Sequence, residues 1–257
     1  MNSKDLTLSA SKIKKYKTCP EQFRLRYLDD EAEATKQERG YKDLGTAVHD
    51  SLEIVLGEMP DNPDEIMLEH MLKEEYRKID PEISSRQEET ALDCLETASR
   101  FLCAQDNLDI VSIEDRIEFV LNRGGLDNSS VSYCDAIVDN DGTREIWDWK
   151  TGRIREDSTP EEEIQQGIMY VIAHQARYGF PPDSMKFIYL KEETVRDRRP
   201  EEADFDQFIS DAKDLVRGIN TDTYPAKPER SKCHWCDYEY FCSASPVSYD
   251  NVDWEKY

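Results

Sequence analysis

The stretch YCDAIVDNDGTREIWDWKTG, residues 133–152, reads as two strands joined by a tight turn. The turn sequence DNDGT carries the Asp-Gly pair that favours a two-residue hairpin. A turn near residues 140–142 places Asp135 roughly across from residue 147 or 148. Asp135 and Asp148 are therefore expected to converge at one end of two adjacent antiparallel strands.

The second strand of this hairpin carries an acid and an amine two residues apart. Side chains alternate across a strand, so Asp148 and Lys150 share one face while Trp147 and Trp149 take the other. A solvent-exposed salt bridge explains this spacing, and so does a site that needs a carboxylate beside a fixed cation. The stretch alone does not choose between the two.

Patterns on either side of the hairpin predict an α/β fold. Apolar spacing and start signals predict a helix, then two more helices, then three strands, a helix, a strand and a final helix. This order is that of an α/β core on a small mixed sheet. The expected helices are 43–58, one starting at Asn62-Pro63, about 85–106, about 160–178 and 203–219; the expected strands are 110–121, 130–138, the run REIWDWKTG and 184–193.

The charge of the chain is strongly acidic but unevenly spread. Its 257 residues include 33 basic and 56 acidic ones, a net charge of −23, yet 13 Tyr, 8 Phe and 4 Trp indicate a folded protein rather than a disordered one. Adaptation to high salt is one hypothesis for the acidity, and activity that rises toward molar KCl would support it. Residues 1–28 are the exception, with seven basic and two acidic residues. This basic segment is either a phosphate-binding patch or a solvated helix face.

No apolar run is long enough to cross a membrane, and the N-terminus MNSKDLTLSASKIKKY lacks the apolar segment of a signal peptide. A cytoplasmic location with no membrane partner is the expectation. In that compartment the seven cysteines are expected to bind metal or to lie buried, rather than to form disulfides.

Four residues form the first candidate site. The carboxylates of Asp135 and Asp148 are the ligands that Mg²⁺ prefers, and an imidazole ligand from His49 would also suit Mn²⁺. Lys150 would orient or deprotonate an attacking water, or neutralise charge on a phosphoryl transition state. Taken singly, each residue also has a structural explanation; together they favour phosphodiester hydrolysis.

These residues resemble the PD-(D/E)XK nuclease signature, in the version found in RecB-type exonuclease domains. The segment GTAVH (Gly45, His49) resembles the family's GxxxH motif, and QGIMY (Gln166, Tyr170) resembles its QxxxY motif. The resemblance implies an αβββαβ restriction-endonuclease-like core with Lys150 catalytic. It also implies the following assignments: His49, Asp135, Asp148 and the main-chain carbonyl of Trp149 as metal ligands, Gln166 and Tyr170 as residues that position the strand or the lysine, and Glu118 as a possible extra acid.

One nuclease domain over 1–257 would then comprise the basic segment 1–28, a helical insertion at 60–107, the nuclease core at 109–219 and a Cys-rich segment at 227–243.

The second candidate site is CHWCDYEYFC, with Cys233, Cys236 and Cys242. Three thiolates leave one ligand missing, and the spacing alone allows structural zinc or an iron–sulfur cluster. Similarity to AddB-type and CRISPR-associated RecB-like exonucleases implies a [4Fe-4S] cluster, with Cys19 in YKTCPEQFRLRYL as the fourth ligand. Cys94, Cys103 and Cys134 would then be ordinary small residues.

The resemblance therefore implies a Mg²⁺- or Mn²⁺-dependent DNA exonuclease, acting on single-stranded DNA ends in recombination and repair or in CRISPR adaptation. The alternative is a catalytically inactive, nuclease-derived subunit that binds DNA or assists assembly. The chain has no GxxxxGK[ST] motif, so any unwinding motor is expected to be a separate protein. DNA is the expected substrate, and a separate helicase or a CRISPR integrase protein is the expected partner.

Overall fold

A computed structural model describes residues 6–30, 32, 41–60, 62–156, 159–240 and 242–246 of the chain. The chain forms two compact units. We call residues 39–121 and 130–206 the core unit, and residues 1–38, 122–129 and 207–257 the terminal unit.

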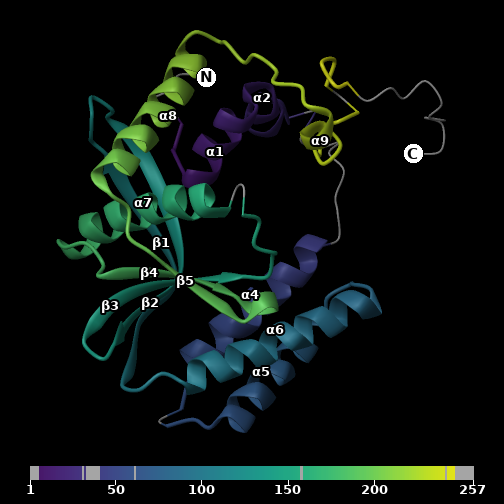
Figure 1. Ribbon diagram of the computed structural model, residues 1–257, viewed down its shortest axis with the longest axis vertical. Coiled ribbons are helices and arrows are strands. Elements are labelled where there is room, and N and C mark those ends of the chain that lie inside the picture. Colours follow the sequence, from purple (N-terminus) through teal and green to yellow (C-terminus); the bar gives the residue numbers. More distant parts are fainter. Residues whose placement is uncertain are drawn as a thin grey trace. The chain divides into compact units, whose positions relative to one another are not determined.

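A five-stranded mixed sheet forms the centre of the core unit, in the order β1-β2-β3-β4-β5 (Figure 1). Strands β2 and β3 are antiparallel, β3 and β4 are parallel, and β4 and β5 are antiparallel. The expected α/β fold with a mixed sheet is confirmed. The strands are β1 (Leu108–Leu121), β2 (Asn128–Asn140), β3 (Thr143–Lys150), β4 (Ser184–Tyr189) and β5 (Thr194–Arg198).

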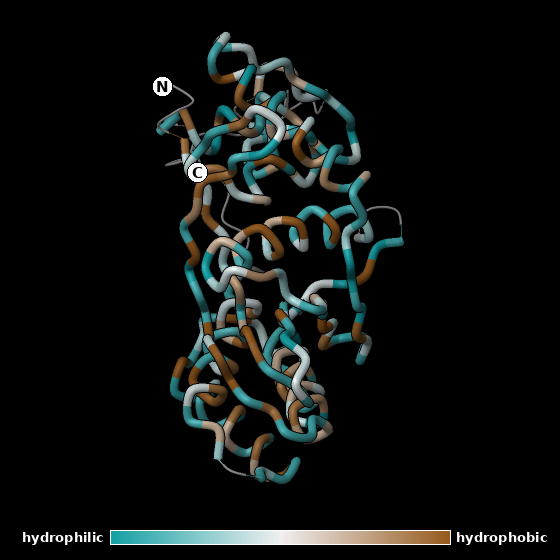
Figure 2. Tube along the Cα trace, turned by 90° about the vertical axis from the view of Figure 1, so that its left-hand side faces the viewer, coloured by the Kyte–Doolittle hydropathy of each residue, from teal (hydrophilic) through white to brown (hydrophobic). Residues whose placement is uncertain are grey.

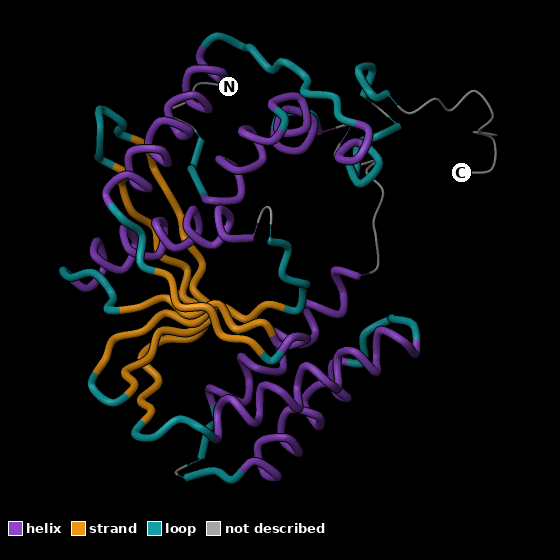
Figure 3. The backbone as a smooth tube through the Cα atoms, viewed as in Figure 1, coloured by secondary structure: helices purple, strands orange, loops and turns teal. Residues whose placement is uncertain are grey.

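Helices cover both faces of this sheet (Figure 3). On one face lie α4 (Tyr41–Gly57), α5 (Glu65–Ile79) and α6 (Ser85–Cys103), and on the other lies α7 (Thr159–Tyr178). The helices expected from the apolar spacing are thus present, with ends that differ by a few residues. The Asn62-Pro63 start signal precedes α5, whose N-cap Asp64 accepts a hydrogen bond from the Met67 N–H.

The tryptophans of β3 form the core beneath the three-helix layer. Trp147 and Trp149 are buried, with ring centroids 5.9 Å apart, and Phe101 of α6 contacts both rings edge-on. Leu72 of α5 and Leu95 of α6 belong to the same apolar cluster. Because residues alternate across the strand, fixing these two indoles on one face commits Asp148 to the other.

Two backbone features shape the strands that carry the candidate site. The hairpin turn has Asp141 and Gly142 in the left-handed region, with φ of 49° and 77°, as the Asp-Gly sequence predicts. In β1 a second left-handed residue, Glu114 with φ of 45°, interrupts the alternation of buried and exposed side chains. Before Glu114 the even-numbered residues 108 and 110 are the less exposed ones, whereas after it the odd-numbered residues from Asp115 to Leu121 are buried. Glu114 therefore marks a bulge that changes which side chains face inward.

The predicted strand 184–193 was too long. Strand β4 ends at Tyr189, a short 3₁₀ turn covers Leu190–Glu192, and β5 returns antiparallel at Thr194–Arg198. Glu193 sits in the left-handed region with φ of 47°, which reverses the chain. No Gly or Asn marks this reversal in the sequence, so the turn chemistry gave no signal.

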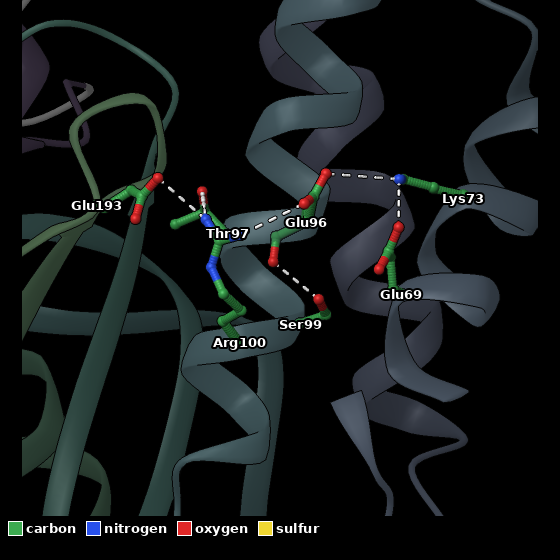
Figure 4. Close-up of polar contacts among 7 residues, drawn as sticks. All are labelled: Glu69, Lys73, Glu96, Thr97, Ser99, Arg100 and Glu193. Atoms are coloured by element: carbon green, nitrogen blue, oxygen red, sulfur yellow. Dashed lines mark hydrogen bonds and ion pairs between the residues drawn. The ribbon is translucent and has the colours of Figure 1, made fainter. Parts of the chain in front are cut away.

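A polar network joins α5, α6 and the β4–β5 turn within the core unit (Figure 4). Lys73 of α5 pairs with Glu69 and lies 3.7 Å from Glu96 of α6. Arg100 of α6 binds Glu96 at 3.4 Å and Glu193 at 3.0 Å. These partly exposed pairs hold the reversal against the helical layer, although each contributes only modestly to stability.

The terminal unit contains α1 (Ala10–Thr18), α2 (Pro20–Tyr27), most of α8 (Glu202–Asn220) and the short α9 (Arg230–Cys233). Tyr16 of α1 packs so closely on α8 that a Cβ at Gly218 would fall 1.9 Å from its hydroxyl. The same hydroxyl donates a hydrogen bond to the Thr223 carbonyl.

Within the described residues, no helix combines the length and the apolar character needed to cross a membrane. Figure 2 shows hydrophobic and hydrophilic residues interspersed along the chain instead.

Candidate functional site

Three side chains from three elements of the core unit form a candidate metal site. His49 of α4, Glu114 of β1 and Asp135 of β2 each offer a ligand atom, and these atoms all lie within 4.8 Å of one another. The His49 Nδ1 is 3.5 Å from the Asp135 Oδ2. One imidazole and two carboxylates match the ligands that Mg²⁺ and Mn²⁺ take in proteins.

The electrostatics of this group favour a cation. Burial and the neighbouring Asp148 carboxylate raise the pKa of Asp135 to about 8. Burial and the charge of Asp135 raise the pKa of Glu114 to about 7, with further contributions from Glu53 and Asp50 of α4. Carboxyls that hold protons near neutral pH give them up when a divalent ion supplies the missing positive charge.

Close packing of α4 brings His49 to the sheet. Gly45 lies one turn before His49, and a Cβ there would meet the Thr151 Oγ1 at 3.1 Å, tighter than an ordinary contact. The Gly-to-His spacing in GTAVH therefore has a physical reason. The glycine lets α4 lie close to Thr151, and His49, one turn later, then reaches the candidate metal group.

A second group of side chains surrounds Asp148. The carboxylate is 2% exposed, and its Oδ1 lies 2.6 Å from the Lys150 Nζ. Its Oδ2 accepts hydrogen bonds from Gln166 at 2.6 Å and from the Tyr170 hydroxyl at 2.5 Å. The Gln166 side chain also accepts a bond of 3.0 Å from Lys150, which closes the network.

Lys150 is held as a cation. Its burial alone would lower the pKa of the amine, but the charges of Asp148 and Asp135 and the hydrogen bond to Asp148 outweigh burial and raise it. The neighbouring Tyr170 is fully buried, and burial raises the pKa of its hydroxyl well above the usual value, so it stays a hydrogen-bond donor. Lys150 is thus suited to neutralise negative charge rather than to accept a proton.

The two groups meet through the backbone of β3. Ala136 pairs with Trp147, so the same register continued by one residue sets Asp135 beside Asp148. The Trp149 N–H donates to the Asp135 Oδ2 at 2.8 Å. His49, Asp135, Asp148, Lys150, Gln166 and Tyr170 are therefore gathered at one place, as the sequence motifs predict. Asp148 and the Trp149 carbonyl as metal ligands stay predictions.

The sequence motifs missed Glu114 and suggested a different acid. Glu118 is exposed and pairs with Arg116 on the same strand, away from the candidate metal group. The bulge at Glu114 explains the error, because strict alternation along β1 does not show which acid is turned toward Asp135.

Comparison with known proteins agrees with this geometry. The family model described as the PD-(D/E)XK nuclease superfamily matches residues 7–243, almost the whole chain. The chain belongs to the PD-(D/E)XK nuclease superfamily. A solved structure described as the crystal structure of SSO0001 is 16% identical, with a TM-score of 0.39; the match covers 79% of this chain and 97% of that one. No curated protein matches the chain significantly.

Membership of this superfamily implies hydrolysis of nucleic acid with a divalent metal ion. The His49, Glu114 and Asp135 group fits such an ion by its chemistry, because all three are oxygen or imidazole donors and two carry protons that a cation would displace. The explanation of Asp148 and Lys150 as an exposed salt bridge is wrong, since Asp148 is buried and both are tied to Gln166.

The four cysteines implied as cluster ligands occur in the terminal unit of this nuclease. Cys19, Cys233, Cys236 and Cys242 all line one pocket. Among the described residues, however, no three of their sulfurs lie within 4.8 Å of one another, so they are not gathered as tightly as the core-unit group. Cys94 and Cys134 are buried, while Cys103 is exposed.

Proposed function

We propose that this nuclease is a Mg²⁺- or Mn²⁺-dependent DNA exonuclease of the RecB-like kind, acting on single-stranded DNA ends. The observation that carries the proposal is the closed network of Asp148, Lys150, Gln166 and Tyr170 beside the His49, Glu114 and Asp135 group. A protein that only binds DNA has no use for a half-buried cation held next to three metal-type ligands.

His49, Glu114 and Asp135 would hold the divalent ion, with Asp148 beside them. When bound, such an ion supplies Lewis-acid stabilisation of the phosphate and lowers the pKa of a coordinated water. The protein fixes the ligands before binding: the Trp149 N–H orients the Asp135 carboxylate, and Tyr170 and Gln166 orient that of Asp148.

Lys150 would stabilise charge on the phosphate during in-line attack. Its ammonium is fixed by Asp148 and Gln166, and it stays protonated because two carboxylates raise its pKa. A fixed cation needs no reorganisation when negative charge develops on the phosphate oxygens. The sequence left three roles open for this lysine, and the network favours charge neutralisation.

We propose further that Cys19, Cys233, Cys236 and Cys242 hold a [4Fe-4S] cluster. Backbone N–H groups donate to three of these sulfurs: Lys227 to Cys19 at 3.4 Å, Tyr238 to Cys236, and Ala244 to Cys242. Such hydrogen bonds suit thiolates that bind metal.

The same pocket contains a buried acid. Glu239 lies beside the cysteines, and its Oε1 has no hydrogen-bond partner among the described residues, although the His234 Nδ1 is 3.8 Å away. Anaerobic purification tests the cluster: a brown protein with four iron atoms per chain supports it, and a colourless protein with one zinc overturns it.

The biological setting in this proposal is recombination and repair or CRISPR adaptation, with a separate helicase or integrase protein as partner. Digestion of 5′- and 3′-labelled single- and double-stranded DNA with Mg²⁺ or Mn²⁺ tests the exonuclease activity and gives its polarity. Products that shorten stepwise from one end support the proposal. Internal cuts in circular single strands contradict the exonuclease assignment, and binding without any cleavage favours the inactive subunit.

Lys150→Ala tests the assigned site. Lys186 on β4 provides the matched control, because its amine also pairs with a buried carboxylate, that of Glu145, at 2.6 Å. We expect Lys150→Ala to abolish cleavage with folding retained, and Lys186→Ala to cleave at nearly the normal rate. Equal activity of the two variants contradicts the site.

A further inference from the structure

The terminal unit differs in charge from the core unit that carries the candidate active site. Its described residues include 12 basic and 10 acidic side chains, whereas those of the core unit include 17 basic and 37 acidic ones. Polyanions are repelled by strongly acidic surfaces, so a nucleic acid meets far less repulsion on the terminal unit.

The segment 227–235 concentrates both charge and aromatic surface within that unit. Lys227, Arg230 and Lys232 are exposed, and Glu229, the one acid of the segment, pairs with Lys232 at 2.5 Å. Lys227 extends to the last turn of α1, where its Nζ donates a 2.7 Å hydrogen bond to the Lys17 carbonyl. This hydrogen bond ties the segment to α1.

Trp235 is the most unusual residue of the segment. Its side chain is 66% exposed, although Trp147 and Trp149 of the core unit are almost completely buried. The His234 ring, 67% exposed, stands edge-on to the indole with centroids 5.5 Å apart. An exposed indole loses the free energy that burial would provide, so packing does not explain its position.

Trp235 is also held in place by its neighbours. It lies between Cys233 and Cys236, and the Trp235 N–H donates to the Lys232 carbonyl at 3.2 Å while the Cys236 N–H donates to the Cys233 carbonyl at 2.9 Å. These two turns fix the backbone that presents the indole. An exposed aromatic ring in a basic segment is the kind of surface on which unpaired bases stack while their phosphates contact lysine and arginine.

We propose that Trp235, with Lys227, Arg230 and Lys232, forms a stacking platform for single-stranded nucleic acid on the terminal unit. The inference deepens the proposed function by assigning substrate contacts outside the catalytic residues, and it rests on that function only for the identity of the strand. Duplex DNA offers phosphates to the cations but keeps its bases stacked inside, so it cannot use the indole.

Two oligonucleotides of equal charge separate stacking from electrostatics. Fluorescence anisotropy of the full chain carrying Lys150→Ala compares a labelled dT 12-mer with an abasic 12-mer, so that cleavage does not interfere. Stacking of one base is worth about 5- to 150-fold in affinity. We expect the dT strand to bind at least about 10-fold more tightly, Trp235→Ala to remove that difference, and Trp235→Phe to keep most of it.

The cations are tested by salt. Combined Arg230→Gln and Lys232→Gln should weaken both oligonucleotides equally and reduce the slope of log K against log salt by about 0.7 for each lost phosphate contact. Equal affinity for the dT and abasic strands in the starting protein overturns the platform, as does a difference that survives Trp235→Ala. If the wild-type chain cleaves DNA but binds both oligonucleotides equally, the platform is contradicted and the nuclease proposal stands. If binding depends on the bases but no cleavage occurs, only the nuclease proposal is contradicted.

Discussion

Replacing Asp135 with Asn should stabilise the metal-free protein, and increasingly so as the pH rises. The Asp135 carboxyl has its pKa raised from 3.8 to about 8 by burial and by Asp148. Between those two values the native state holds a proton that the unfolded state has released. Stability therefore falls as pH rises through this window, by at most about 1.4 kcal/mol per pH unit.

The expected loss of stability follows from the pH range between the two pKa values. From pH 5 to pH 8 this one group would remove up to about 4 kcal/mol of stability, that is, three units at about 1.4 kcal/mol each. Coupling to Glu114 shares the effect between the two carboxyls, so we expect about 2–4 kcal/mol. An asparagine carries no charge at any of these pH values and can still accept the Trp149 N–H.

Urea unfolding in metal-free buffer at pH 5, 6, 7 and 8 measures the effect, with the buried Trp147 and Trp149 as fluorescent reporters of the core unit. Asp139→Asn is the matched control on the same strand. There the hydrogen bond from Arg144 lowers the pKa of Asp139, so this variant should lose stability at all four pH values. An Asp135→Asn protein that is no more stable than wild type at pH 8 refutes the reasoning.

Adding the metal should reduce the stability difference between the two proteins. Mg²⁺ at about 100 times its dissociation constant would stabilise the wild-type protein by about 2.7 kcal/mol. Asp135→Asn, which lacks a charged ligand, should gain much less. Equal stabilisation of both proteins by Mg²⁺ places the ion elsewhere.

Three further substitutions test the site and its support. Tyr170→Phe removes a hydrogen bond to Asp148 and should lower kcat by about 10- to 100-fold in a cleavage assay, with DNA affinity little changed; an unchanged kcat would show that the hydroxyl is not needed. Gly45→Val should push α4 away from Thr151 and weaken metal binding, measured by Mn²⁺ titration. Leu72→Ala in the helical layer should cost about 2–5 kcal/mol in urea unfolding but leave the cleavage rate at low temperature unchanged.

Much of the core unit was predictable because short-range patterns agree with the fold. The Asp-Gly turn sets the β2–β3 register, and that register brings Asp135 to Asp148. Helical spacing from Gln166 to Tyr170 places both side chains on one face of α7, where both reach the same oxygen. Local rules sufficed here because each contact follows from one element's periodicity.

The errors occur where a backbone reversal depends on tertiary packing. Glu193 reverses the chain without Gly or Asn, at a position where Arg100 of α6 contacts its carboxylate. Glu114 likewise adopts a left-handed conformation inside a strand. Neither residue type favours that conformation, so no single-sequence rule indicates it.

Glu114 adds backbone strain and a carboxyl to the candidate metal site. A glutamate in the left-handed region is strained, and here it adds a third carboxyl to a place where Asp135 and Asp148 already repel one another. Selection for stability alone would remove such an arrangement. Strain and repulsion persist together because the core packing of Trp147 and Trp149 fixes β3, while the Trp149 N–H holds Asp135 in place. Burial and the neighbouring carboxylates raise the pKa of Asp135 to about 8 and that of Glu114 to about 7, so a cation bound there would displace their protons.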